Sequence, residues 1–428
     1  MLKINRALAT LAGVALLTTA CGGGGESSST SAEPEAAPSA AAESGAPTRG
    51  NADLVIWTDD LKIDAVKEIA TGFGETNGIS VDVQAITDTQ SNFVTANTAG
   101  NGPDVVLGAH DWIGNLVQNG AIDPLQLTPD QLGAYSDVAV KATTYDEQLY
   151  GLPYGVESLV LYRNTDIVPD APATLDDAFA AGQAAVAAGK AESPFNLPIG
   201  EQGDAYHMQP LYTSAGGYVF GRNAEGDYDP ADLGVGSPQS IEAAKKIAAL
   251  GEGGSKVLSR SVSNDNSIAL FAAGKAPFLL SGPWAKADVE KAGFGYAIQP
   301  VPGFAGMEPA KPFAGVQAFF VASKGKNKAF AQEFVANTMN TPEAMQTMFD
   351  KANLPPALTA LQESAGASDP DLKAYLDAAN SGEPMPAIPQ MQAVFEPLGK
   401  AYAAIVGGAD PAATMQATGT TIKDTIGG

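Results

Sequence analysis

The sequence predicts an α/β fold divided into two lobes. Short apolar stretches alternate with segments of helical periodicity, beginning with a strand at 54–57, a helix at 63–73 and a strand at 79–83. The part of the chain from Ala52 to Gly428 is longer than the ~250 to 300 residues at which a single hydrophobic core stops growing. We therefore expect two lobes, each built from strands and helices.

The same alternation continues through the rest of the chain. Further apolar stretches predict strands at 105–107, 159–162, 278–280 and 317–322, and helical spacing predicts helices at 111–118, 241–250 and 328–339. In the last hundred residues, three capping residues precede a proline and predict helix starts: Thr341-Pro342, Asp369-Pro370 and Asp410-Pro411. The first strands and helices form a β-α-β series, so we expect a parallel sheet there.

The first residues differ in composition from the rest of the chain. Lys3 and Arg6 precede an apolar run that ends at Ala20, directly before the only cysteine, Cys21. A short basic segment, a short apolar core and a small residue before the cut are the parts of a secretory signal. The run is shorter than the ~20 apolar residues that span a bilayer. We predict a signal peptide over residues 1–20.

Residues 21–51 are predicted to be a lipidated cysteine followed by a flexible tether. Gly, Ser, Ala, Glu and Pro dominate the stretch after Cys21, a composition typical of flexible linkers. A cysteine at the end of a signal resembles the lipobox of bacterial lipoproteins, although Thr18 stands where that motif usually has Leu. The resemblance implies an extracytoplasmic protein anchored to the cell membrane by acyl chains on Cys21.

The charge balance and the residue counts exclude several classes of protein. The chain has 24 basic and 48 acidic residues, a net charge of -24, which argues against binding to nucleic acid or to anionic lipid headgroups. One cysteine allows no disulfide within the chain, and two histidines are too few for a typical zinc cluster. We expect no cofactor and no metal, and we interpret the acidity as a solvated surface.

Carboxylates and indoles stand just after predicted strands. Asp59 and Asp60 follow the first strand, Asp111 and Trp112 follow the third, and Trp284 follows a later one. In open α/β sheets, ligands bind at the carboxyl ends of the strands. A carboxylate accepts hydrogen bonds from paired hydroxyl groups, and an indole covers the apolar face of a sugar ring. The pattern predicts a carbohydrate site, with helix capping as the alternative role of Asp60 and Asp111.

Seven short stretches occur in the order seen in a known protein family. They are Leu54-Val-Ile-Trp57, Gly102-Pro-Asp104, Ala109-His-Asp111, Val156-Glu157, Ser281-Gly-Pro-Trp284, Lys311-Pro-Phe-Ala-Gly-Val316 and Met385-Pro-Ala-Ile-Pro-Gln-Met391. The order resembles that of the maltose- and maltodextrin-binding members of the solute-binding proteins that feed sugars to ABC importers. The similarity runs from Asp53 to about Lys423.

This resemblance implies a periplasmic-binding-protein-like fold. Two discontinuous α/β lobes, joined by a hinge, would close around a ligand in the cleft. By the same resemblance, the N-terminal lobe holds residues 52–155 and 317–367, and the C-terminal lobe holds residues 156–316 and 368–428.

The resemblance also implies ligand-binding positions. Asp111 matches the family's Asp after Ala-His, Glu157 matches the Glu of the hinge region, and Trp284 matches a stacking Trp. In the second lobe, Asp204 and Tyr206 fall on a Glu and a Tyr of the family. We therefore expect these five side chains to contact the ligand.

Other positions match less directly or depart from the family. Asp60, or Asp59 in its place, matches the carboxylate after the first strand, and Phe395 stands where the family has Trp. Gly108 replaces a Trp and Trp112 replaces an Arg, while Gly399 replaces an Arg near the end of the chain. One aromatic side chain has thus moved by four positions, and a charged donor is missing.

By this resemblance, the chain is a monomer that captures maltose or a maltodextrin and delivers it to the permease subunits of an ABC importer. The departures leave open another α-glucoside such as trehalose, and a polyamine or a metal ion on a related fold. A glycoside hydrolase could pair Asp111 with Glu157. However, nothing in the sequence raises the pKa of one carboxylate while leaving the other ionised, so we expect a protein that is not an enzyme.

Overall fold

The computed structural model describes residue 47 and residues 49–224, 226–352 and 354–427. The predicted signal peptide, Cys21 and most of the predicted tether lie outside this part of the chain. The first elements are β1 (Leu54–Thr58), α1 (Ile63–Asn77), β2 (Val81–Ala85), α2 (Thr89–Thr98), β3 (Val105–Ala109), the 3₁₀ turn η1 (His110–Trp112), α3 (Ile113–Gln118), β4 (Ile122–Asp123), α4 (Pro129–Leu132), α5 (Asp137–Thr143), β5 (Thr144–Tyr145), β6 (Gln148–Leu149) and β7 (Gly151–Glu157).

The middle and last parts of the chain complete the element order. The middle contains β8 (Val160–Asn164), α6 (Leu175–Ala187), α7 (Ala205–Ser214), β9 (Phe220–Arg222), β10 (Tyr228–Leu233), α8 (Pro238–Leu250), α9 (Ser267–Ala272), β11 (Phe278–Ser281), η2 (Pro283–Ala285), α10 (Lys286–Lys291) and β12 (Tyr296–Pro300). The last part contains β13 (Phe313–Ala322), α11 (Lys328–Glu333), the π-helical turn η3 (Phe334–Thr338), α12 (Pro342–Ala352), α13 (Thr359–Gly366), α14 (Pro370–Ser381), β14 (Glu383–Pro384), η4 (Pro389–Ala393), α15 (Phe395–Val406) and α16 (Pro411–Gly427).

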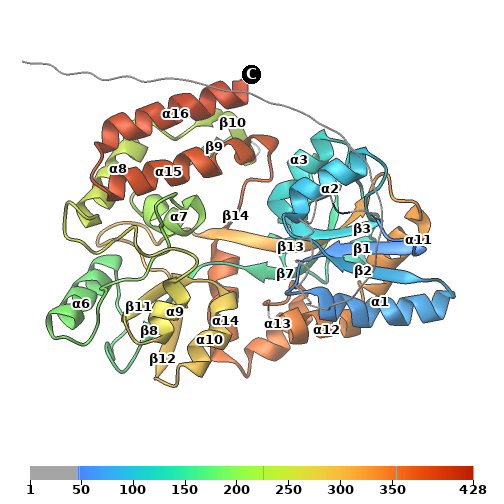
Figure 1. Cartoon of the computed structure of the whole chain (residues 1–428), viewed down its shortest axis with the longest axis horizontal. Helices are drawn as coiled ribbons and strands as arrows, with labels where there is room; N and C mark the ends of the chain where they lie inside the picture. The colour runs from blue at the N-terminus through green and yellow to red at the C-terminus, as the bar shows by residue number, and fades with distance from the viewer. Residues whose placement is uncertain (1–46, 48, 225, 353, 428) are drawn as a thin grey trace, which may run out of the picture. The chain divides into compact units, whose positions relative to one another are not determined.

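The larger sheet combines the first strands with β13. Strands β1, β2 and β3 are parallel, as the sequence predicts, and lie in the order β3-β1-β2. Strand β13 lies antiparallel to β3 and also pairs with β4 and β7. Figure 1 places α1, α2 and α3 around these strands. Because parallel strands end at one edge of a sheet, the residues that follow β1 and β3 lie at the same edge.

The smaller sheet has the strand order β11-β8-β12, and its neighbours are antiparallel. The sequence predicts the first two strands but not their direction. Tyr162 of β8 is fully buried, and its hydroxyl donates to the carbonyl oxygen of Gly282 at 2.8 Å. This bond fixes the backbone at the point where β11 ends.

Strands β7 and β13 connect the two groups of elements. They pair antiparallel, from Gly151 opposite Phe320 to Glu157 opposite Gly315, and β14 pairs with β13 in the parallel direction. In Figure 1, the antiparallel strands β7 and β13 extend between the group that contains β1–β3 and the group that contains α6, α7 and α15. These strands are therefore the structural candidates for a hinge.

The hydrophobic cores divide the chain in the same way. One cluster gathers buried side chains from residues 159–313 and 385–422, and a second gathers them from residues 54–156 and 316–379. Helix α14 packs Leu372 and Leu376 into the second cluster, whereas Tyr375 packs beside Val160 and Tyr162. The exact lobe boundaries given above stay a prediction, because α14 contacts both sides.

Local sequence explains where several helices begin and end. Helix α1 ends at Gly78, whose φ of 65° lies in the left-handed region that favours glycine. The side chains of Thr341, Asp369 and Asp410 accept backbone N–H groups of α12, α14 and α16, so all three predicted caps are confirmed. The helix predicted at 328–339 is interrupted, since α11 continues as the π-helical turn η3.

The C-terminal end of the predicted tether requires a correction. Arg49, placed in the flexible segment 21–51 by composition, has a side chain only 3% exposed. Its guanidinium pairs at 2.5 Å with Asp104, which is fully buried, and its backbone N–H donates to the carbonyl oxygen of Asn101. Asp104 also accepts the N–H groups of Val55 and Asn327. The prediction of a tether is therefore wrong at Arg49, because a single buried ion pair outweighs the polar composition around it.

Candidate ligand-binding cleft

A cavity of about 730 Å³ lies at strand ends from both lobes. Leu61 and Lys62, which follow β1, line it on one side, and Trp284, which follows β11, lines it on the other. Glu157 at the end of β7 and Gln317 of β13 stand between them. The cavity therefore occupies the position where the sequence pattern predicts a ligand.

The loop after β1 is held in place by Asp59. Its carboxylate accepts the backbone N–H of Leu61 at 3.0 Å and forms an ion pair with the ammonium group of Lys62. Lys62 is buried, whereas the side chain of Asp59 is 42% exposed. Asp60 is exposed and makes no hydrogen bond or ion pair with any described residue. Of the two carboxylates that the sequence offers here, the structure brings Asp59 into the network of the cleft.

Glu157 links the two strands of the candidate hinge. Its carboxylate accepts a hydrogen bond from the side-chain amide of Gln317 at 3.0 Å. Burial raises the pKa of Glu157, while the hydrogen bond from Gln317 and the charge of Lys62 oppose that change. The carboxylate keeps hydrogen-bonding capacity beyond the single bond from Gln317.

Asp111 is a buried carboxylate with an unused oxygen. It lies in η1, is 5% exposed, and its Oδ1 has no hydrogen-bond partner among the described residues. Burial raises the pKa of Asp111 to about 7, and the nearby charge of Glu157 acts in the same direction. Its side chain caps neither η1 nor α3. A buried polar atom without a partner is costly, so the capping alternative is wrong and a ligand hydroxyl is a suitable partner.

His110 fastens the turn that carries Asp111. Its Nδ1 accepts the backbone N–H of Val316 at 3.0 Å, so its Nε2 carries the proton and donates to the carbonyl oxygen of Met385 at 3.0 Å. Burial lowers the pKa of His110 to about 4, which keeps the ring neutral. Through His110, η1 is bound to β13 and to the segment that follows β14.

The two tryptophans of the prediction lie in different surroundings. The indole of Trp112 covers Gly108, where an added Cβ would lie 2.0 Å from a ring carbon, and it packs on a cluster that includes Trp57. Trp284 covers Gly282 in the same way, but its side chain is 36% exposed and lines the cavity. Trp112 therefore fills the space of a side chain at position 108, and Trp284 offers an open aromatic face.

An aromatic group surrounds Trp284. The ring of Tyr206 lies 6.5 Å from that of Trp284 and is stacked on Phe313 at 6.4 Å, while His207 meets Trp284 edge-on at 6.2 Å. Burial raises the pKa of Tyr206, and the charges of Glu157 and two nearby aspartates add to the effect. Tyr206 thus lies close to the carboxylates of the cleft, as the sequence predicts.

Asp204 has a structural role that the sequence does not indicate. It is the N-cap of α7, because its Oδ1 accepts the backbone N–H of His207 at 2.8 Å. Its Oδ2 contacts His207 Nδ1 at 2.8 Å and accepts from Asn264 at 2.6 Å. Burial alone would raise the pKa of Asp204, but these hydrogen bonds outweigh it and lower the pKa. Both oxygens are therefore already engaged.

The start of α15 contains the last predicted positions. Phe395 is partly buried and packs on the same hydrophobic cluster as Tyr206. One turn later, the backbone of Gly399 meets the loop before α7, where a Cβ on Gly203 would lie 1.7 Å from the carbonyl oxygen of Gly399. This close approach requires a glycine at position 203, whereas a Cβ on Gly399 itself would lie 3.2 Å from the carbonyl carbon of Gly203.

Comparison with known proteins places this architecture in a family. A family model described as "Bacterial extracellular solute-binding protein" matches residues 68–374. The chain belongs to this family. The Galactooligosaccharide-binding protein of Bacillus subtilis (strain 168) is 28% identical to it over 97% of this chain and 95% of that protein. The Maltodextrin-binding protein MdxE of the same organism is 28% identical over 83% of this chain and 85% of that protein.

A solved structure supports the same assignment. The cyclo/maltodextrin-binding protein complexed with maltotetraose matches with a TM-score of 0.75 and 27% sequence identity, covering 87% of this chain and 97% of that chain. The predicted two-lobe α/β fold and the predicted resemblance to this family are therefore confirmed.

In this solute-binding protein, only part of the predicted site lines one cavity. Glu157 and Trp284 line it, and Asp59 adjoins it through Lys62. The remaining predicted residues, Asp60, Asp111, Trp112, Asp204, Tyr206 and Phe395, are not among its lining residues. Leu61, Gln317 and Lys286 line the cavity without having been predicted. The sequence offers one indication that Gln317 belongs to the site, because it is a polar residue inside an otherwise apolar strand.

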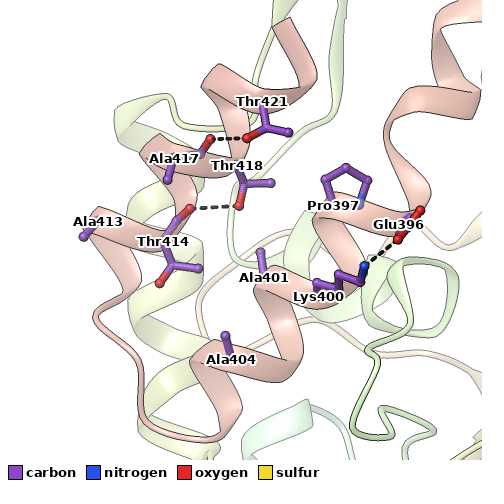
Figure 2. A pocket seen from close by; sticks show the side chains of 10 residues that line it. All are labelled: Glu396, Pro397, Lys400, Ala401, Ala404, Ala413, Thr414, Ala417, Thr418 and Thr421. Atoms are coloured by element: carbon purple, nitrogen blue, oxygen red, sulfur yellow. Dashed lines mark hydrogen bonds and ion pairs between the residues drawn. The ribbon is translucent and has the colours of Figure 1, made fainter. Parts of the chain in front are cut away.

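A second hollow of the solute-binding protein lies between α15 and α16 (Figure 2). The hydroxyl groups of Thr418 and Thr421 are bonded to carbonyl oxygens of their own helix, at 2.9 and 3.0 Å. Its other lining residues include Ala401, Ala404 and Ala417. Glu396 and Lys400, which also line it, form an ion pair with each other, and none of its lining residues is aromatic. The cavity beside Trp284 is therefore the better candidate for a sugar.

The part of the chain that the structure describes contains neither a metal cluster nor a membrane-spanning helix. No group of three or more His, Cys, Asp or Glu side chains in this part of the chain is arranged to hold a metal ion. No helix within the same residues is long and apolar enough to cross a membrane.

Proposed function

We propose that this solute-binding protein captures a maltodextrin or a related oligosaccharide and delivers it to an ABC importer. The observation that carries the proposal is an exposed indole, Trp284, that lines one cavity with the carboxylate of Glu157, while the buried carboxylate of Asp111 lies near Glu157 at the end of β3. An indole covers the apolar face of a pyranose, and carboxylates accept its hydroxyl groups. Relatives of the chain include proteins named for binding maltodextrin, maltooligosaccharides and maltotriose.

Capture occurs by lobe closure about β7, β13 and the segment after β14. The N-terminal lobe contributes Asp111 and the loop held by Asp59, and the C-terminal lobe contributes Trp284 and Tyr206. A ligand that touches both sets favours the closed form by its difference in affinity for the two forms. The closed form is then the one that the permease subunits recognise.

The remaining predicted residues take supporting roles in this proposal. Asp204 orients His207 and thereby the aromatic group around Trp284. Phe395 supports the same group from α15, and Trp112 packs the strand end that carries Asp111. Asp60 has the least support as a ligand contact, because Asp59 makes the polar contacts that hold the loop after β1.

The cellular setting is part of the proposal. Lipidation of Cys21 would anchor the protein outside the cell membrane, and two of the curated relatives are named solute-binding lipoproteins. We propose that the protein acts as a monomer.

Catalysis is not part of this function. In a glycoside hydrolase the environment separates two carboxylates, so that one stays ionised while the pKa of the other is raised. Here burial raises the pKa of both Asp111 and Glu157. A binder of hydroxyl groups fits this pair better than an acid and base pair does.

A second ligand class is favoured by one observation. A relative named a galactooligosaccharide-binding protein matches over 97% of this chain. Galactose and glucose differ at one hydroxyl group, and a lost hydrogen bond in a buried site costs about 1 to 3 kcal/mol. The two sugar classes are therefore separable by affinity.

Calorimetric titration tests the proposal. Residues 46–428, which keep Arg49, would be titrated in parallel with maltotriose, trehalose and a β-linked galactotriose. Micromolar or tighter binding of maltotriose is the expected result. Tighter binding of the galactotriose would show that galactooligosaccharides are the preferred ligands. No heat with any of the sugars, from a folded sample, would contradict an oligosaccharide-binding role.

A further inference from the structure

Leu61 stands out among the apolar side chains of the described residues. It is 73% exposed, whereas the other large exposed apolar side chains, Met307, Val186 and Trp284, are 47%, 36% and 36% exposed. A single exposed leucine is common in proteins. Its position is the informative feature, because Leu61 lines the same cavity as Trp284.

The loop that carries Leu61 is fixed by polar contacts. The backbone N–H of Leu61 donates to Asp59 Oδ1 at 3.0 Å, and the backbone N–H of Lys62 donates to the carbonyl oxygen of Asp59 at 3.3 Å. The buried ammonium group of Lys62 closes the loop through its ion pair with Asp59. Helix α1 begins one residue later, at Ile63. The side chain of Leu61 is therefore held in solvent by a defined backbone.

Besides the charged Lys286 and Glu290, the second lobe contributes apolar side chains to the cavity. Pro283, Trp284 and Ala287 line it, all of them from η2 and α10 of the second lobe. Leu61 is thus the exposed apolar side chain of the first lobe that shares a cavity with the exposed indole of the second.

We propose that Leu61 is a ligand contact that covers one face of a sugar ring while Trp284 covers the other. This inference rests on the proposed oligosaccharide-binding function and adds a residue to it. The contact exists only when the lobes close, since Leu61 and Trp284 belong to different lobes. Burying the leucine against the sugar stabilises the closed form alone, so it slows dissociation and leaves association nearly unchanged.

The test is a comparison of Leu61→Ala with wild type in the full-length chain, using maltotriose as the ligand. Leu61→Ala should raise Kd about tenfold, with the change in the dissociation rate measured by stopped-flow fluorescence. The heat-capacity change of binding should become less negative, because less apolar surface is buried. Leu61→Met keeps the apolar volume and should restore most of the affinity.

Met307→Ala is the matched control. Met307 is 47% exposed on a second-lobe loop and does not line the cavity, so its removal should leave Kd unchanged. Because Leu61 is exposed, Leu61→Ala should also keep the thermal midpoint of the wild type, which separates a lost contact from misfolding.

The outcomes separate the two proposals. If wild type binds maltotriose and Leu61→Ala binds it with the same Kd and dissociation rate, the role of Leu61 is wrong and the sugar-binding function stands. If folded wild type binds no sugar, the proposed function is wrong and the role of Leu61 falls with it. An equal loss in Met307→Ala would also overturn the specific role of Leu61.

Discussion

The ends of β3 in the first lobe and of β11 in the second use the same local arrangement with different results. In each, a glycine is covered by the indole of a tryptophan from the following 3₁₀ turn: Gly108 by Trp112, and Gly282 by Trp284. Neither glycine is needed for a positive φ, since both are absent from the residues with that conformation. Both are needed for space. The first indole is packed on a hydrophobic cluster, and the second is open to the cavity.

The surroundings decide which indole becomes a binding surface. Trp112 packs beside Trp57 and Phe93, so the first lobe presents Asp111 at its strand end instead of an aromatic face. Trp284 has Tyr206 and His207 as neighbours and keeps one third of its surface exposed. One motif therefore builds core in one lobe and a candidate sugar platform in the other.

The largest expected effect comes from the buried ion pair that holds the start of β3 in the first lobe. Arg49→Ala leaves the buried carboxylate of Asp104, at the start of β3, without its ion-pair partner. Breaking a buried pair in this way costs about 3 to 5 kcal/mol. Urea denaturation should show this loss of unfolding free energy. The control is Lys351→Ala, which removes an exposed ion pair with Glu68 and should cost less than about 1 kcal/mol.

The second prediction concerns pH and applies to the first lobe alone. The pKa of Asp111 in the folded protein is about 7, above its ordinary value of 3.8. As pH rises between these values, the unfolded chain has released this proton and the folded chain retains it, so stability falls by up to ~1.4 kcal/mol per pH unit. Between pH 5 and pH 7 the loss is about 2 kcal/mol, and above pH 7 it levels off.

Asp111→Asn should remove this part of the pH dependence. Glu157, whose pKa is shifted in the same direction, stays in both proteins, so most of its contribution cancels in the difference between them. The measurement is the difference in unfolding free energy between variant and wild type at pH 5, 6, 7 and 8. A difference that stays constant across this range would contradict the raised pKa.

The third prediction removes the open indole. Trp284→Ala should weaken maltotriose binding by about 2 kcal/mol, roughly thirtyfold in Kd, as expected for an aromatic residue at the centre of a contact. Calorimetry gives the Kd directly. A metal site would lose little affinity in this variant, so an unchanged Kd for the bound solute would argue against a sugar.

The smallest expected effects come from the glycines and separate the two strand ends most sharply. A methyl group at position 108 would lie 2.0 Å from the ring of Trp112, and one at position 282 would lie 2.1 Å from the ring of Trp284. Overpacking of this kind costs about 1 kcal/mol or more. Gly108→Ala should mainly lower the thermal midpoint, because the displaced indole is packed in the core. Gly282→Ala should mainly weaken sugar binding. If Gly108→Ala weakened binding and Gly282→Ala lowered the thermal midpoint, the comparison of the two strand ends would be wrong.

The sequence predicts much of the fold because hydrophobic period and turn chemistry are local. The strand at 54–57, the helix that starts at Ile63 and the caps at Asp369 and Asp410 were all expected from a few neighbouring residues. The direction of the strands beside β8 depends on partners more than a hundred residues away, which a local pattern does not contain.

The candidate site was less predictable for the same physical reason. Asp59 and Asp60 are adjacent and chemically identical, and only the ion pair with Lys62 distinguishes them. Asp204 has the residue type of a ligand contact, yet it caps α7 and holds His207. Asp111 is predicted as a ligand contact from its place after a strand, but its burial without a partner depends on the whole surrounding structure.

The anchoring of Arg49 has a mechanical consequence. The backbone and guanidinium of Arg49 make four bonds, to Asn101, Asp104, Ala52 and Asp53, at the ends where β1 and β3 begin. The side chains of the cleft stand where the same strands end, a full strand length away. A pulling force on Arg49 would therefore act first on the starts of β1 and β3. The cleft lies at the opposite edge of the sheet, away from this point of attachment.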